Sequence, residues 1–136
     1  MLDKFNHLNI KEVNTIFDSS MKLNDNCDKT IAQLEYVDVI GSLMYDMHCT
    51  RPYMTYDTCK LSRYTSKPST DHWKAIARVF GYLKRTIDLG LFYSDFPAVM
   101  EGYSDTSWMT SSSDNKSTSG WIFSLGGGAI SWASKK

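Results

Sequence analysis

The pattern of apolar residues changes its period near residue 88, and this change constrains the fold more than any other feature. Before it, apolar residues recur every three or four positions, which is typical of helices that bury one face. After it, short apolar runs alternate with turn-forming residues, which is typical of closely connected strands. The sequence therefore predicts an α+β fold, with a mainly helical segment over residues 1–88 and a strand segment over 89–136.

Three helices are expected in the first segment. Pro52 ends the first, because a proline disfavours helical geometry at the residue before it. Ser69 or Thr70 is a good N-cap for the third. Gly41 lies on the first apolar face and predicts a close helix neighbour there. The three expected faces are Val37, Ile40, Gly41, Met44 and Met47, then Met54, Thr58 and Leu61, then Trp73, Ile76, Ala77, Phe80 and Leu83.

Strands are expected at 89–94, 99–105, 120–126 and 128–134, with the loop "SSSDNKSTS" before the third. The glycines of 126–128 predict a tight hairpin turn, since glycine permits positive φ. Together these strands predict a small antiparallel meander. At least one face of such a sheet needs a cover. Either the preceding helices supply it, or the chain ends before its cover arrives.

Composition excludes several classes of protein. The chain has 15 basic and 15 acidic residues, which argues against a dominant basic surface for nucleic acid. Its three cysteines have no CxxC spacing and suit free thiols in a reducing compartment. No stretch approaches the roughly 20 apolar residues of a membrane span, and the amino end does not read as a secretory signal. We therefore expect an intracellular protein of the cytoplasm or nucleus, with no membrane and no small-molecule substrate.

Several phrases occur in one order along nearly the whole chain: "VIGSLMYDMHCTRP", "LSRYTSKPSTDHWKAIARVFGYLKRT", "LGLFYS", "EGYSDTSW" and "KSTSGWIFSLGGGAISWASKK". Together they closely resemble the Pol polyprotein of copia-type LTR retrotransposons. The resemblance implies the end of a reverse transcriptase followed by the first strands of an RNase H. Four positions depart from the family pattern. Tyr53 and Ser107 stand where the family usually has Asp, Arg85 stands for a usual Gly, and Ile16 for a usual Pro.

By this resemblance Asp105 matches the first catalytic carboxylate of RNase H. Cleavage in that family uses two Mg²⁺ ions about 3.5–4 Å apart, held by several converging carboxylates. The family's other three carboxylates match positions beyond Lys136. Asp95, Glu101 and Asp114 are the local candidates to replace them. Glu101 shares a strand face with Asp105 but lies about 13 Å away at the normal strand rise.

Other motifs favour structural roles. "YVDV" at 36–39 lies on a helical pattern with Val37 in the core, so its likeness to a polymerase turn is accidental. "SLGGGAIS" lacks the spacing of a phosphate loop. His72 next to the N-cap predicts a surface or capping role, and His48 with Cys49 lacks the third partner of a nucleophilic site.

The sequence thus predicts a Pol fragment that is inactive alone, with no bound cofactor of its own. One alternative is a part-enzyme, in which another Pol chain completes an Mg²⁺ site around Asp105 and the substrate is an RNA–DNA hybrid. The other alternative is a reused module that binds protein or nucleic acid. An uncovered sheet would favour this role, because its edge accepts a foreign strand.

Overall fold

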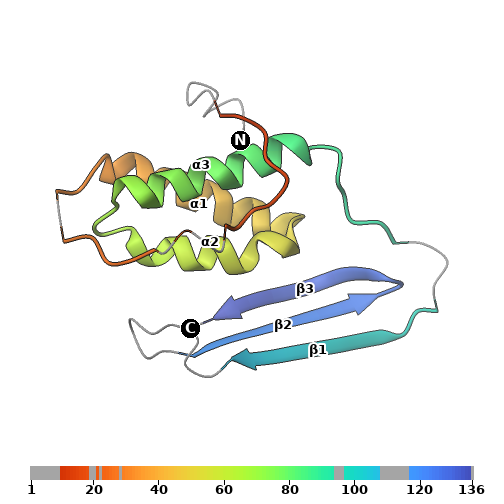
Figure 1. Cartoon of the computed structure of the whole chain (residues 1–136). Coiled ribbons are helices and arrows are strands. Elements are labelled where there is room, and N and C mark those ends of the chain that lie inside the picture. The colour runs from red at the N-terminus through yellow and green to blue at the C-terminus, as the bar shows by residue number, and fades with distance from the viewer. Residues whose placement is uncertain are drawn as a thin grey trace.

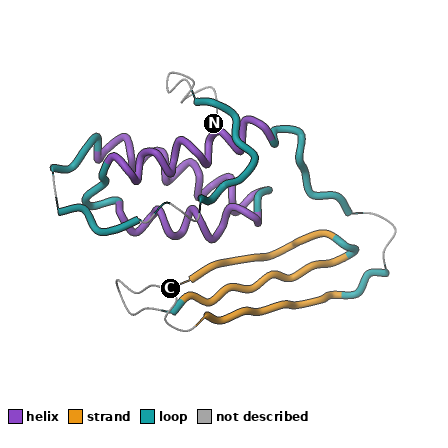
Figure 2. The backbone as a smooth tube through the Cα atoms, viewed as in Figure 1, coloured by secondary structure: helices purple, strands orange, loops and turns teal. Residues whose placement is uncertain are grey.

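The computed structural model describes residues 10–18, 21, 23–27, 29–93, 97–107 and 117–135. These residues form a layer of helices above a three-stranded antiparallel sheet, which confirms the predicted α+β fold (Figures 1 and 2). No described helix is both long and apolar enough to cross a membrane. The elements are α1 Gln33–Cys49, η2 Pro52–Met54, α2 Thr55–Leu61, η3 Ser62–Tyr64, α3 Thr70–Arg85, β1 Met100–Ser107, β2 Thr118–Leu125 and β3 Gly128–Lys135.

The core lies between the helices, because α1 and α3 each bury one apolar stripe. Tyr36 of α1 is central to it: its hydroxyl donates to the Leu61 carbonyl at 2.9 Å, and its ring packs edge-on against Trp73 at 5.6 Å. Burial raises the pKa of the Tyr36 phenol, which keeps the hydroxyl available as a donor. The buried apolar residues are Tyr36, Val39, Ile40, Leu43, Met47, Met54, Leu61, Ile76, Val79, Phe80 and Leu83.

The predicted apolar face of α1 is partly wrong. Val37 and Met44 are 45% and 36% exposed, whereas Tyr36, Val39 and Leu43 are fully buried. The other two apolar members of the predicted face are buried as expected. Two overlapping stripes run along this helix, and their spacing alone does not separate them. The Tyr36 stripe is buried because Leu61 supplies the acceptor that a buried hydroxyl requires.

The close backbone approach expected at Gly41 occurs at Gly81 instead. Gly41 is exposed, and a Cβ built on it has no neighbour within 4 Å. A Cβ on Gly81 would collide with the carbonyl oxygen of Lys11, and the Val13 N–H donates to the Gly81 carbonyl at 3.4 Å. The segment over residues 10–18 therefore lies against α3 where the helix has no side chain.

We predict opposite effects for two glycine substitutions within helices. Gly81→Ala should lower the free energy of unfolding by about 1–3 kcal/mol, because the new methyl group forces backbones apart. Gly41→Ala is the matched control and should raise it by up to about 1 kcal/mol through helix propensity alone. Urea unfolding followed by far-UV circular dichroism measures both. Equal effects at the two positions would contradict the close contact at Gly81.

His72 caps α3 from a buried position. The Ser69 side chain accepts from the His72 N–H at 3.4 Å, and the Ser69 N–H donates to His72 Nδ1 at 2.9 Å. The ring is fully buried and stacks on Tyr64 with centroids 3.9 Å apart. The predicted capping role is confirmed, whereas the surface position is wrong. Burial lowers the pKa of the imidazole, although the Asn24 backbone, Asp71 and Asp25 act in the opposite direction.

This lowered pKa predicts a loss of stability in mild acid. Above the ordinary histidine pKa of about 6.5, the imidazole is neutral in both states and contributes no pH dependence. As the pH falls below that value, the unfolded chain binds a proton that the folded chain resists, so the free energy of unfolding falls. Urea melts from neutral pH to about pH 5 should show this slope, and His72→Gln should flatten it. A slope that His72→Gln leaves unchanged would contradict this assignment.

The three later predicted strands are confirmed, and their order in the sheet is β1-β2-β3. Gly126 and Gly127 form the tight turn between β2 and β3 with φ of 58° and 78°. The predicted strand at 89–94 is wrong, because its described residues 89–93 adopt no regular structure. Tyr93 instead attaches this segment through its side chain, since its hydroxyl donates to the Ala129 carbonyl at 2.7 Å. Most of the predicted loop before β2 lies outside the described residues.

Candidate functional site

Asp105 lies near the end of β1, which is the outermost strand of the sheet. It pairs with Gly120 of β2, which in turn pairs with Ser134 of β3. Because paired residues share a face, a glycine and a serine are the cross-strand neighbours of this carboxylate. Asp105 is exposed, and no described side chain forms a hydrogen bond or ion pair with it. Its role as a catalytic residue stays a prediction.

The described residues do not fit the two-metal site that the resemblance implies. They contain no group of three or more His, Cys, Asp and Glu side chains that would hold a metal ion. Glu101 is on the same face of β1 as Asp105 but pairs with Ser124, four residues farther along the ladder. Asp95 and Asp114 lie outside the described residues. No catalytic step through Mg²⁺ follows from this part of the chain.

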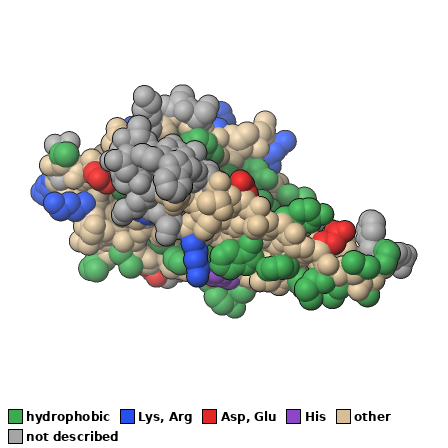
Figure 3. Space-filling view, turned by 90° about the horizontal axis from the view of Figure 1, so that it is seen from below, with side chains coloured by type: hydrophobic (Ala, Val, Ile, Leu, Met, Phe, Trp, Pro, Cys, Tyr) green, Lys and Arg blue, Asp and Glu red, His purple; other side chains and the backbone are tan. Residues whose placement is uncertain are grey.

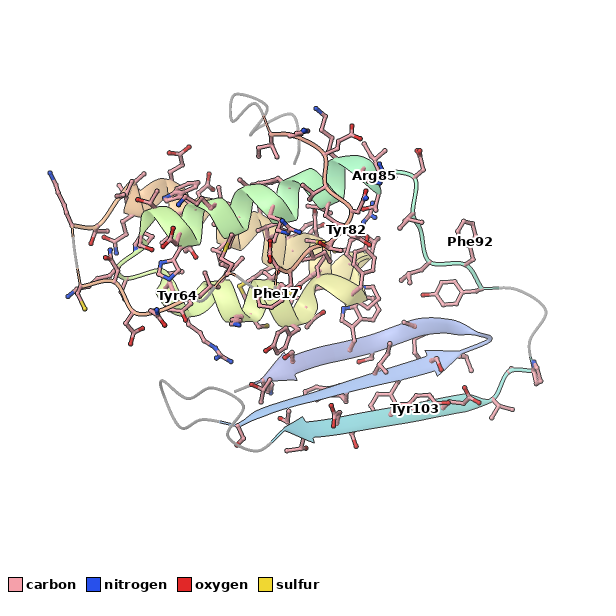
Figure 4. The ribbon with its side chains drawn as sticks, in the orientation of Figure 1. Phe17, Tyr64, Tyr82, Arg85, Phe92 and Tyr103 are labelled. Atoms are coloured by element: carbon pink, nitrogen blue, oxygen red, sulfur yellow. The ribbon has the colours of Figure 1, made fainter. Side chains whose placement is uncertain are left out.

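A groove of about 360 Å³ opens between the start of α2 and the sheet, and Asp105 forms part of its wall. We call it the interlayer groove. Its helical wall includes Tyr53 and Tyr56, and its sheet wall includes Tyr103 and Ile122. Tyr103 is labelled on β1 in Figure 4. Among the described residues that line the groove, Asp105 is the sole acidic or basic one, so these residues combine aromatic rings with one negative charge.

Arg51 holds the helical wall in place. One of its Nη atoms donates to the Tyr53 hydroxyl at 2.5 Å and to the Thr86 carbonyl at 2.7 Å. The other donates to the Ile87 carbonyl at 3.2 Å. The Tyr53 ring also packs edge-on against Tyr82 with centroids 5.8 Å apart. Tyr53 is thus a positioned residue, although the resemblance drew attention to it only as a departure.

The sheet contacts the helices through β3. The Trp132 indole N–H donates to the Met47 carbonyl near the end of α1 at 2.7 Å. The Cys59 thiol of α2 donates to the Ser134 carbonyl at 3.4 Å. Burial raises the pKa of this thiol, which favours the protonated form that donates. Figure 1 shows β3 nearest the helices and β1 farthest from them.

The remaining sequence candidates do not add to this site. Val37 of "YVDV" is exposed rather than in the core, so that part of the interpretation is wrong. His48 and Cys49 are both exposed at the end of α1. Sequence reasoning located Asp105 on its strand but missed Tyr53 and Tyr56 as its neighbours across the groove. The sequence offered one signal for these two tyrosines, which is that they stand three residues apart at the start of a helix.

Comparison with curated proteins identifies relatives along the whole chain. Over 102 residues the chain is 41% identical to secreted RxLR effector protein 161 of Plasmopara viticola. The aligned residues make up 74% of this chain and 72% of that protein. The chain belongs to the same family as this effector protein. No family model and no solved structure matches it.

The chain is also homologous to a short segment of copia-type Pol polyproteins. It is 34% identical over 142 residues to the retrovirus-related Pol polyprotein from transposon TNT 1-94 of Nicotiana tabacum, and 38% identical over 138 residues to that from transposon RE2 of Arabidopsis thaliana. These matches cover 99% and 100% of this chain. The chain spans 11% and 9% of the length of these two relatives. The predicted relationship to copia-type Pol proteins is thereby confirmed.

We predict that Trp132→Phe loosens the sheet from the helices, because it removes the hydrogen bond to the Met47 carbonyl. Its cost in unfolding free energy should exceed that of Trp121→Phe by about 1 kcal/mol. Trp121 is the matched control. The Lys135 ammonium lies 5.5 Å from the centre of its ring, but no hydrogen bond of its indole is described. Hydrogen exchange should show faster exchange in β3 for Trp132→Phe. Equal exchange in the two variants would contradict this docking contact.

Proposed function

We propose that the chain corresponds to the junction between a copia-type reverse transcriptase and its RNase H, and that it does not cleave RNA by itself. The single observation that carries this proposal is the isolation of Asp105 among the described residues. Phosphodiester hydrolysis by two metals requires several carboxylates to hold the ions that stabilise the attacking and leaving oxygens. The nearest acid on the same strand face, Glu101, is too far along β1 to share an ion with Asp105.

The order of the elements supports the same junction. The helical part carries the phrases that resemble the end of the polymerase, and β1 carries most of the phrase that resembles the first RNase H strand. Matches to Pol polyproteins run over essentially the whole chain rather than over one part of it. In the parent family the substrate is an RNA–DNA hybrid and the cofactor is Mg²⁺. For this chain both belong only to the part-enzyme alternative, in which another Pol chain completes the site.

We predict no cleavage of a labelled RNA–DNA hybrid by the purified chain with Mg²⁺. Asp105→Asn should behave identically, because the described residues bring together no group of carboxylates that would hold two metal ions. Gel electrophoresis of the hybrid measures both. Cleavage by the chain alone that disappears in Asp105→Asn would overturn the proposal.

The same assay separates the part-enzyme alternative. The chain is mixed with a separately purified Pol segment that supplies the remaining RNase H residues. Cleavage that appears only in the mixture, and is lost in Asp105→Asn but kept in Glu101→Gln, would assign Asp105 to a shared metal site. Glu101→Gln is the matched control because it removes a carboxylate from the same face of the same strand.

A binding module is the second candidate function, and one comparison favours it. This chain spans 72% of the length of one relative, and that relative is named an effector protein. A short member of the family thus carries a name other than Pol. The interlayer groove and the outer edge of β1 provide this chain with surfaces for a partner. Saturable binding of one partner that survives moderate salt supports this role, whereas binding that never saturates indicates adhesion of exposed apolar surface.

A further inference from the structure

The capping box of α3 contains a histidine where such boxes usually carry glutamate or glutamine. Ser69 is the N-cap, and His72 stands at the third position of the helix. The Ser69 N–H donates to His72 Nδ1 at 2.9 Å, and the Ser69 side-chain oxygen lies 3.0 Å from the same nitrogen. A histidine accepts such a bond only through an unprotonated nitrogen. The cap of α3 therefore depends on the protonation state of one ring.

The position of each proton on this ring follows from its partners. Because Nδ1 accepts from a backbone N–H, the single proton of the neutral imidazole is on Nε2. Nε2 is buried and forms no hydrogen bond with a described residue. A second proton can enter only at Nδ1, where it meets the Ser69 N–H, which is also a donor. Even if that proton turns to the Ser69 hydroxyl, the Ser69 N–H loses its acceptor, so protonation breaks the cap.

The surroundings of His72 favour the neutral ring. The side chain is fully buried, and Tyr64 of η3 stacks on it with ring centroids 3.9 Å apart. Burial removes the water that would solvate an imidazolium, and it lowers the pKa of His72. The groups around the ring belong to residues 24–25, 64 and 69–71. All of them lie inside the helical part, so the burial of this ring does not depend on either end of the chain.

The charges near the ring oppose this effect only in part. The Asn24 backbone and the Asp71 and Asp25 carboxylates favour the charged ring, but burial has the larger influence on its pKa. Both acids are exposed, so solvent screens them, and Asp71 is also paired with the Lys74 ammonium at 2.8 Å. The acidic side chains visible in Figure 3 lie apart from one another, so that face adds no concentrated negative field.

The start of α3 also anchors the chain that leads into α1. The Pro68 carbonyl, directly before the N-cap, accepts from the Asn26 side-chain amide at 3.1 Å and from the Ile31 N–H at 3.2 Å. The Trp73 indole N–H donates to the Ile31 carbonyl at 3.2 Å. Residues 23–27 and 29–31 are therefore tied to the same turn that the histidine caps. We call these residues the anchored segment.

Tyr64 connects the ring to the anchored segment from the other side. Its ring stacks on His72, and its hydroxyl donates to the Leu23 carbonyl at 3.1 Å. Tyr64 is labelled in Figure 4. A displacement of the imidazole thus disturbs both the cap and the stack that position this segment.

We propose that His72 is a pH-sensitive latch, whose protonation opens the cap of α3 and releases the anchored segment while the core between α1 and α3 stays folded. Above the ordinary histidine pKa of about 6.5 the ring is neutral in the closed and the open form, so the latch stays closed. As the pH falls below that value, the open form binds a proton that the closed form resists, and the open population rises. Local opening exposes fewer buried contacts than global unfolding and therefore precedes it.

Amide hydrogen exchange of the full chain at pH 7 and pH 5, followed by mass spectrometry, tests the latch. Protection, corrected for the intrinsic pH dependence of exchange, should fall more than about twofold around Ile31 and Ser69. The upper limit is about 25-fold, set by an open-form pKa of about 6.5. Protection around Leu43 in the buried stripe of α1 should fall less. An equal loss in α1 would indicate global unfolding and overturn the proposal, as would unchanged protection in the anchored segment.

His72→Gln is the decisive variant, because glutamine has the usual capping-box side chain and does not titrate. It should abolish the pH difference around Ile31 and Ser69. Ser69→Ala is the matched control, since it removes the side-chain half of the box but keeps the titrating ring and the backbone N–H. It should lower protection at both pH values and keep the pH difference. A difference that survives in His72→Gln, or disappears in Ser69→Ala, would overturn the proposal.

The unmodified chain supplies a second readout that requires no variant. The ring protons of His72, followed by NMR, should titrate with the same midpoint as the loss of protection around Ile31. Two different midpoints would assign the opening to another group and overturn the proposal. None of these measurements involves cleavage of a hybrid, so failure of the latch is distinct from failure of the proposed function.

Discussion

The arrangement of this protein depends on how its sheet is attached to its helices, and that attachment runs through β3. A three-stranded sheet needs a helix or another sheet against one face to be stable in water. Here the Trp132 indole bonds the Met47 carbonyl and the Cys59 thiol bonds the Ser134 carbonyl, so α1 and α2 both contact the third strand. β1 lies farthest from the helices as a consequence (Figure 1). The interlayer groove follows from this one-sided docking.

The helices could be predicted from the sequence because their signals are local. Pro52 marks a boundary, Ser69 marks an N-cap, and the stripe on α3 has one clear phase. The errors occur where the deciding contact is distant in sequence. Tyr36 is buried because Leu61 accepts its hydrogen bond, and the close approach at Gly81 comes from Lys11. Neither partner can be identified from the spacing of residues within a helix.

The strand part shows the same division. The three strands of the hairpins follow from alternation and from the glycines of their turn, both of which are local. The segment before β1 has the composition of a strand, yet its described residues attach through Tyr93 rather than through a backbone ladder. Asp105 could be placed on its strand, but the groove beside it could not be predicted, because Tyr53 and Tyr56 come from the helical layer. The division of the chain at residue 88 stays a prediction.

The number of carboxylates that converge decides what Asp105 can do. Two bound cations require several oxygen ligands from different elements, and the described residues bring no such group together. A lysine or arginine needs one carboxylate and gains from a neighbouring ring, and β1 supplies both on one face. The first role needs structural elements beyond those described here, whereas a contact with one cationic side chain does not. The relatives span the same range, from long Pol polyproteins to a short protein named as an effector.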